Sequence, residues 1–196
     1  MFEEVLNTFE NQDIKNFAEE LITTIPDYFW KVPASSTGKY HPKYALGRGG
    51  LYRHTLAVCR ILNHLLSLEQ YKKKYGSRER DLLRIAAIMH DSRKSGSQEE
   101  YEQNKHTKFN HPLLAAEVVL GYKGKKFVED YEIEFIVNAI SCHMGEFNRS
   151  DYYDGELPKP MFEYEKLLHL VDYLASRRDI EVKFNNQGFI KKIFNI

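Results

Sequence analysis

The sequence has few cysteines and no long apolar run. Cys59 and Cys142 are the two cysteines among 196 residues, and both lie in apolar segments. Two such thiols are typical of reduced, mostly buried side chains in a cytosolic protein rather than of a disulfide scaffold. No apolar run reaches the ~20 residues that cross a bilayer, and the acidic, polar start lacks a signal-peptide pattern. We therefore expect a cytoplasmic protein with no membrane partner.

An excess of charge of one sign is also missing. The 28 basic residues balance 28 acidic ones, so no overall field attracts nucleic acid or an anionic membrane. Internal repeats, low-complexity tracts and the GxxxxGK[ST] phosphate loop are absent as well. The length suits a single domain. We expect its core in residues 40–178, with N-terminal helices and a loop in 1–39 and a tail in 179–196.

Apolar residues recur at helical spacing along most of the chain, which predicts an all-α helical bundle. The expected helices cover residues 2–25 (one or two helices), 51–70, 78–90, 111–120, 129–144 and 160–177. Residues 28–50 should form a long loop, and KKKYGS at 72–77 a basic turn. Asn110 is a candidate N-cap, with Pro112 in the first turn after it. Two β-favouring runs in the tail predict a small hairpin.

Acidic and imidazole side chains occupy inward helix positions or helix ends. They are His54, His90, Asp91, His111, His143 and Asp172. A buried aspartate is costly unless it is paired or bound to metal, so Asp172, in an apolar stretch, is the most diagnostic of them. Imidazole nitrogens with carboxylate oxygens suit several divalent metals and select none. Taken singly, an inward histidine is more often a satisfied core residue than a metal ligand.

Four short motifs surround these residues in a fixed order. They are GGLYRHT at 49–55, IMHDSRK at 88–94, SCHMG at 141–145 and DYLAS at 172–176. Their order, H…HD…D on helices, resembles the HD-domain metal-dependent phosphohydrolase superfamily. The nearest likeness is to HD domains of bacterial 3′–5′ exoribonucleases and of small phage and bacterial HD proteins. The resemblance covers about residues 40–178 and implies the HD-domain helical bundle.

The resemblance also implies a set of metal ligands. His54, His90, Asp91 and Asp172 would ligate a first ion, and His111 and His143 match the extra histidines of subfamilies that bind a second, with Asp91 bridging. The cofactor would be one or two divalent ions of Mn, Mg, Ni, Co, Zn or Fe. The chain departs from some branches. The acidic pair of guanosine-tetraphosphate hydrolases and the GYP element of cyclic-di-GMP phosphodiesterases are missing, and Cys142 replaces a histidine of the exonuclease-like pattern.

The implied reaction is hydrolysis of a nucleotide or nucleic-acid phosphoester by a metal-activated water. Asp91 and Lys94 are the expected catalytic residues, and Lys94, His41, Arg177 and Arg178 the expected substrate-binding residues. The partner would be a phosphorylated small molecule or nucleotide, or a short single-stranded nucleic acid. Two alternatives stay open: a mixed-valent di-iron oxygenase with the same six ligands, and a non-catalytic nucleotide-binding regulatory module. His169, one turn before Asp172, either orients that aspartate or is a packed histidine near the surface.

Overall fold

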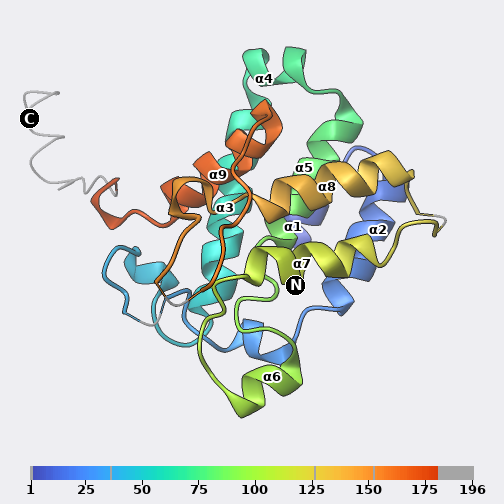
Figure 1. Cartoon of the computed structure of the whole chain (residues 1–196). Helices are drawn as coiled ribbons and strands as arrows, with labels where there is room; N and C mark the ends of the chain where they lie inside the picture. The colour runs from blue at the N-terminus through green and yellow to red at the C-terminus, as the bar shows by residue number, and fades with distance from the viewer. Residues whose placement is uncertain (1, 36, 126, 152, 181–196) are drawn as a thin grey trace, which may run out of the picture.

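The computed structural model describes residues 2–35, 37–125, 127–151 and 153–180, and these ranges are helical without strands (Figure 1). The α-helices are α1 (Glu3–Leu6), α2 (Gln12–Thr23), α3 (Gly50–Ser67), α4 (Glu69–Lys74), α5 (Ser77–Met89), α6 (Gln98–Gln103), α7 (His111–Leu120), α8 (Asp130–Ser141) and α9 (Glu163–Ala175). Short 3-10 helices cover Asp27–Trp30, Lys43–Ala45, Gly145–Phe147 and Arg178–Ile180. The all-α prediction is confirmed. The predicted hairpin falls on residues 181–196, outside the described ranges.

The bundle is built around α3 and α5. Helix α3 packs against α5 and α9, while α5 also packs against α8 and α2, and α7 lies along α8 (Figure 1). Every residue of α5 from Asp81 to Met89 is buried, as expected of a helix enclosed by its neighbours. The helix therefore ends inside the protein, where His90 and Asp91 are 0% and 1% exposed. Its C-terminal end forms the middle of the site described below.

The predicted helix over 51–70 is wrong at its end, and so is the basic turn after it. Leu68 takes an extended conformation (ψ 140°) that ends α3, and α4 begins at the next residue. Helix α4 includes Lys72, Lys73 and Lys74, so the lysines are helical rather than part of a turn. Leu68 is 47% exposed, and α4 has no buried residue. Helix α4 thus lies on the surface, so burial of apolar side chains does not require it to continue in the direction of α3.

Helix α7 begins at His111, as predicted, with Pro112 in its first turn. Asn110 stands at the N-cap position, but its side chain makes no capping hydrogen bond within the described residues. Both cysteines are free and buried, as expected. The Cys142 thiol donates a hydrogen bond to the carbonyl of Asn138 at 3.0 Å, and burial raises its pKa to about 12. Among the described residues, no helix combines the length and the apolar character needed to cross a bilayer.

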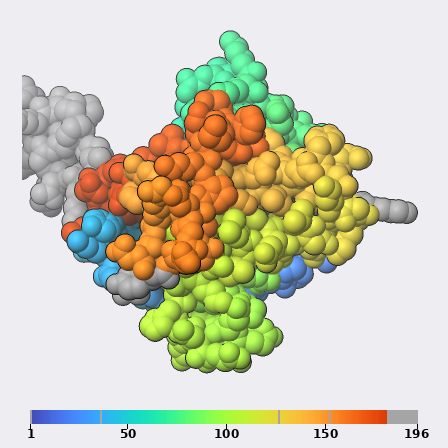
Figure 2. Space-filling model, viewed as in Figure 1, coloured from blue at the N-terminus to red at the C-terminus, as the bar shows by residue number. Residues whose placement is uncertain are grey.

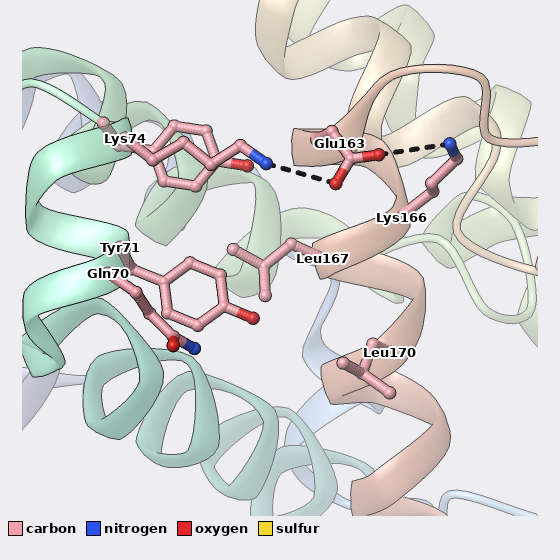
Figure 3. A pocket seen from close by; sticks show the side chains of 8 residues that line it. Gln70, Tyr71, Lys74, Glu163, Lys166, Leu167 and Leu170 are labelled. Carbon is pink, nitrogen blue, oxygen red and sulfur yellow. Dashed lines mark hydrogen bonds and ion pairs between the residues drawn. The ribbon is translucent and has the colours of Figure 1, made fainter.

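A groove separates α4 from the first half of α9 (Figure 3). Its volume is about 290 Å³, and it is lined by Gln70, Tyr71, Lys74, Tyr75, Glu163, Lys166, Leu167 and Leu170. The Glu163 carboxylate accepts hydrogen bonds from Lys74 at 3.1 Å and from Lys166 at 3.3 Å. Such exposed ion pairs contribute little to stability. Asp172 lies further along α9, where its carboxylate contacts the buried His54 and His90.

Candidate metal centre

Six side chains from five helices meet at the centre of the bundle. They are His54 in α3, His90 and Asp91 at the end of α5, His111 at the start of α7, His143 just after α8, and Asp172 in α9. The side chain of Asp172 is 18% exposed, and the other five are almost fully buried. The structure thus brings together all six side chains that the sequence suggested as metal ligands.

The Asp91 carboxylate divides the histidines into two pairs. Its Oδ2 lies 3.8 Å from His54 Nε2 and 3.6 Å from His90 Nε2. Its Oδ1 lies 2.9 Å from His111 Nε2 and 3.7 Å from His143 Nε2. Within each trio of Asp91 and one histidine pair, the ligand atoms lie within 4.8 Å of one another. Asp91 therefore connects two groups of atoms that could each hold a metal ion.

Asp172 joins the first group only. Its Oδ1 lies 2.9 Å from His54 Nε2 and 3.7 Å from His90 Nε2. Burial alone would raise the pKa of Asp172, but the hydrogen bond to His54 and the surrounding imidazoles hold it below its usual value. The first group thus has two imidazoles and two carboxylates, whereas the second has two imidazoles and one carboxylate. The two groups are unequal in negative charge.

Three histidines are held in the orientation that a metal ligand needs. The Nδ1 atoms of His90, His111 and His143 lie 2.8, 2.7 and 2.8 Å from the carbonyl oxygens three residues earlier in the chain. With the Nδ1–H donating to a carbonyl, the lone pair of Nε2 points into the cluster. These Nε2 atoms are buried and have no hydrogen-bond partner among the described residues; His111 Nε2 is close to Asp91 but not aligned with it.

Those buried Nε2 atoms are a test of whether the residues fit a metal. An unsatisfied buried acceptor costs about 1–3 kcal/mol. A cation at the cluster would remove that cost at several atoms together, and it would also offset the negative charge of two adjacent aspartates. Neutral imidazole with carboxylate is a donor set for zinc, manganese, iron and similar divalent ions. The residues present therefore fit a metal.

The charge states around Asp91 also favour metal binding. Burial lowers the pKa of His90 and of His111 to about 4, so both are neutral near pH 7. Burial would raise the pKa of Asp91, but the Lys94 ammonium and the imidazoles around it hold the pKa well below the usual value. Lys94 Nζ is 3.0 Å from each Asp91 oxygen. Asp91 and Asp172 are thus ionised and His90 and His111 neutral, the forms in which carboxylates and imidazoles bind metals.

His169 supports His143 rather than Asp172. Its Nδ1 lies 2.8 Å from the His143 carbonyl oxygen, so the suggestion that it orients Asp172 is replaced by this contact. Gly145, two residues after His143, has a positive φ of 59°. A Cβ at Gly145 would clash with the His169 ring. Glycine is therefore needed at 145 both for the backbone conformation and for the close approach of His169.

The family model described as "HD domain" matches residues 51–177. The chain belongs to the HD domain family. The matched range includes all six clustered side chains, and HD domains are generally metal-dependent phosphohydrolases. No curated protein and no solved structure matches the chain. The resemblance to the superfamily is confirmed, while the nearer likeness to exoribonuclease domains stays a prediction.

A cavity of about 750 Å³ opens from the cluster of this HD domain toward the surface. It is lined by Tyr40, His41, His54, Lys94, Met144, Phe147, His169, Asp172, Tyr173, Ser176, Arg177 and Asp179. Three of the predicted substrate-binding residues, His41, Lys94 and Arg177, are in this lining. Arg178 is exposed and does not line the cavity, and its backbone N–H donates to the Tyr40 carbonyl at 2.8 Å. Its role in substrate binding stays a prediction.

The sequence did not single out the aromatic part of this lining. Tyr40, Phe147 and Tyr173 are three of the 13 tyrosines and 12 phenylalanines in the chain, so residue type alone does not distinguish them. Two of these aromatic residues are sequence neighbours of predicted site residues, because Tyr40 precedes His41 and Tyr173 follows Asp172. Phe147 had no such signal, since it reaches the cavity through the turn that follows Gly145.

Proposed function

We propose that this HD domain hydrolyses a phosphoester bond of a nucleotide or nucleic acid with one or two divalent metal ions. The observation that carries the proposal is the Asp91 carboxylate, each oxygen of which faces its own pair of imidazoles. A carboxylate shared in this way suits two neighbouring cations, and paired cations are a recurrent arrangement in enzymes that cleave phosphoesters. The cavity beside the cluster leaves room for a substrate.

Each ion would have its own ligands. His54, His90, Asp172 and Asp91 Oδ2 would hold the first, and His111, His143 and Asp91 Oδ1 the second. A bound divalent ion makes water a better nucleophile at neutral pH and polarises a phosphoryl oxygen. The protein's own contribution is to keep His90 and His111 neutral through burial. It also orients these two imidazoles and that of His143 through their Nδ1–H bonds to backbone carbonyls.

Lys94 is the proposed catalytic cation beside Asp91. Its side chain is 18% exposed, its ammonium contacts both Asp91 oxygens, and it lines the cavity. A phosphoryl group next to the cluster would therefore meet this ammonium, which can neutralise negative charge on a phosphoryl or leaving oxygen.

His41, whose ring centroid lies 5.6 Å from that of His54, is the proposed hydrogen-bonding residue of the cavity. Burial lowers its pKa to about 4, so it is neutral near pH 7. Its buried Nδ1 has no hydrogen-bond partner among the described residues. A neutral imidazole with a free ring nitrogen can donate to or accept from a substrate, depending on its tautomer.

The proposal is tested by metal analysis followed by assays on a substrate panel. The metal content of freshly purified protein would be measured first, and then hydrolysis of nucleotides, oligonucleotides and simple phosphodiesters with Mn²⁺, Mg²⁺, Ni²⁺ or Co²⁺. We expect turnover that Asp91→Asn abolishes and that Glu163→Gln, in the groove next to α4, leaves unchanged. Absence of turnover across the whole panel with every metal would overturn the proposal.

The same six ligands also suit a di-iron oxygenase, and the same purified protein distinguishes the two functions. An oxygenase would contain two irons per chain and would consume O₂ with a carbon-bonded substrate. Protein that binds metal and nucleotide yet never turns over would instead be a regulatory binding module. Either result would replace the hydrolase proposal.

A further inference from the structure

The cavity beside the metal cluster has two chemically different ends. One end carries the groups of the proposed reaction, His54, Lys94 and Asp172. The other end carries three aromatic rings with one arginine, namely Tyr40, Phe147, Tyr173 and Arg177, which we call the aromatic rim. A phosphate and a metal need only the first end. The aromatic rim is therefore left without a role in phosphoester cleavage itself.

Arg177 is surrounded by the rings of this rim. Its Cζ lies 4.1 Å from the ring centroid of Tyr173 and 5.5 Å from those of Tyr40 and Phe147. The rings of Phe147 and Tyr173 are nearly parallel, with an interplanar angle of 7° and centroids 6.3 Å apart. A guanidinium held against aromatic faces is itself a flat surface on which another planar group can stack.

The rim is assembled from three segments that are tied together. Figure 2 shows the light-blue segment around residues 37–45 next to the red end of α9, with the orange segment before α9 beside them. Two hydrogen bonds of 2.8 Å join the first segment to that helix end, from Tyr44 Oη to the Ala175 carbonyl and from the Arg178 N–H to the Tyr40 carbonyl. The segment that carries Tyr40 is thus held against the end of α9 before a ligand binds, which reduces the entropy lost on binding.

Two features of the aromatic rim indicate a ligand-binding site. Phe147 is 45% exposed and Tyr40 is 54% exposed, although both are large aromatic residues. The Arg177 Nε is buried and has no hydrogen-bond acceptor among the described residues. A buried guanidinium donor without an acceptor is costly, so an acceptor supplied by a ligand would be favourable. Both features call for one ligand that is planar and also carries hydrogen-bond acceptors.

We propose that the aromatic rim binds the nucleobase of the substrate. The base stacks on Phe147 and Tyr40, and Arg177 donates from Nε to an acceptor of the bound nucleoside. This proposal rests on the proposed function, because a phosphoester at the metal cluster places the rest of a nucleotide along the cavity toward the rim. The cavity volume of about 750 Å³ lies within the range of about 300–1,000 Å³ of small-molecule sites.

The test measures binding of nucleosides, which carry the base but no phosphoester. Adenosine and uridine would be titrated into the purified protein by calorimetry, with ribose as the probe that lacks a base. Stacking on one ring accounts for about tenfold in affinity, so we expect Phe147→Ala to weaken nucleoside binding by about that factor. Phe147→Tyr keeps the ring and should bind like wild type. Phe162→Ala is the matched control, since Phe162 is 62% exposed and outside the cavity.

A second measurement separates this proposal from the hydrolase proposal. The ratio of kcat/KM for adenosine 5′-monophosphate to kcat/KM for ribose 5-phosphate should fall about tenfold in Phe147→Ala, because only the first substrate carries a base. If ribose 5-phosphate is hydrolysed as well as the nucleotide, or if neither nucleoside binds wild type better than ribose does, the nucleobase site is overturned while hydrolysis stands. If Phe147-dependent nucleoside binding occurs without hydrolysis of any ester, the hydrolase proposal fails and the nucleobase site stands.

Discussion

At the residue scale, the metal cluster is built on carboxylates at positions where a charged side chain is unusual. Asp172 lies between apolar neighbours in α9, and a carboxylate there is costly without a partner. The pair at 90–91 follows a helix whose last five residues, 85–89, are all apolar. The sequence does not predict that Asp91 is shared between two pairs of histidines, because only the structure shows that its two oxygens face different pairs.

Because each Asp91 oxygen faces a different pair of histidines, two variants should bind different numbers of metal ions. Asp91→Asn removes charge from both ligand groups, so we expect it to lower the bound metal at both positions and to reduce kcat by at least about 100-fold. His143→Ala removes a ligand from the second group only, so one ion should remain. Elemental analysis of the dialysed proteins measures the stoichiometry. Equal metal content in the two variants would mean that Asp91 does not bridge.

Gly145 predicts a second effect at the residue scale. Gly145→Ala forces an alanine into the left-handed backbone conformation and against the His169 ring. That ring is hydrogen-bonded to the His143 carbonyl. Gly124→Ala is the matched control, because Gly124 also has a positive φ, of 78°, and no atom lies within 4 Å of its Cβ position. The control should lose about 1–2 kcal/mol of unfolding free energy, and Gly145→Ala clearly more.

Metal titration completes this comparison. Gly145→Ala should also bind its second ion more weakly than wild type, since His143 is displaced, whereas Gly124→Ala should bind both ions normally. Chemical denaturation measures the first effect and calorimetry the second. Equal behaviour of the two variants in both measurements would remove the role given to His169.

At the scale of elements, helices with a buried face were predicted well and surface helices poorly. Helix α5 matches its prediction because burial of every residue from Asp81 to Met89 leaves a strong apolar signal. Helix α6 has no buried residue and was not predicted. Its start carries the S-x-x-E pattern, in which Ser97 and Glu100 cap each other's backbone N–H groups. That local signal was present, but without apolar periodicity it was not interpreted as a helix.

The hydrogen bonds of Asp81 join the start of α2 to α5 and predict a loss of stability when this carboxylate is removed. Asp81 is fully buried, and its Oδ2 accepts hydrogen bonds from the backbone N–H groups of Glu10 and Asn11, while Oδ1 accepts from Arg84. Asp81→Ala leaves these donors unpaired, so we expect a loss of about 3–5 kcal/mol in unfolding free energy. Urea denaturation measures it.

The control for this loss is Glu163→Gln, which removes an exposed carboxylate that also pairs with two cations. It should change the unfolding free energy by less than about 1 kcal/mol. A similar small change in Asp81→Ala would show that the buried network does not hold α2 against α5. Metal content should be normal in both variants, because neither residue contacts the cluster.

At the scale of the whole molecule, the convergence of five helices is the part that sequence periodicity cannot predict. Periodicity indicates which face of a helix is inward, but it does not say which inward residues of different helices meet. The order of the four motifs supplied that information through the family resemblance, and the match over residues 51–177 confirms the family. The aromatic rim had no comparable motif, since its rings come from three segments that only the fold brings together.

The buried histidines predict how the stability of the metal-free protein depends on pH. The pKa of His90 and of His111 is about 4 in the folded protein, against about 6.5 in an unfolded chain. Between these values the unfolded chain binds more protons, so stability is fully present above pH 6.5 and is lost as pH falls toward 4. The expected slope is about 1.4 kcal/mol per pH unit for each histidine.

Urea denaturation of metal-stripped protein between pH 7.5 and 4.5 measures this slope. Metal-loaded protein is the comparison, because a bound ion adds its own competition with protons. A denaturation midpoint of the stripped protein that does not fall between pH 6.5 and 4.5 would contradict the buried, neutral state of these imidazoles.

The unequal exposure of the ligands has a consequence for how fast metal is exchanged. His54 and Asp172 line the cavity, whereas His111 and His143 are not among its lining residues. An ion held by His54 and Asp172 can leave through the open cavity. An ion held by His111 and His143 must first pass His54 and Asp172 or wait for the bundle to open locally. A chelator should therefore remove the two ions in sequence, and the ion at His111 and His143 should dissociate much more slowly than the first.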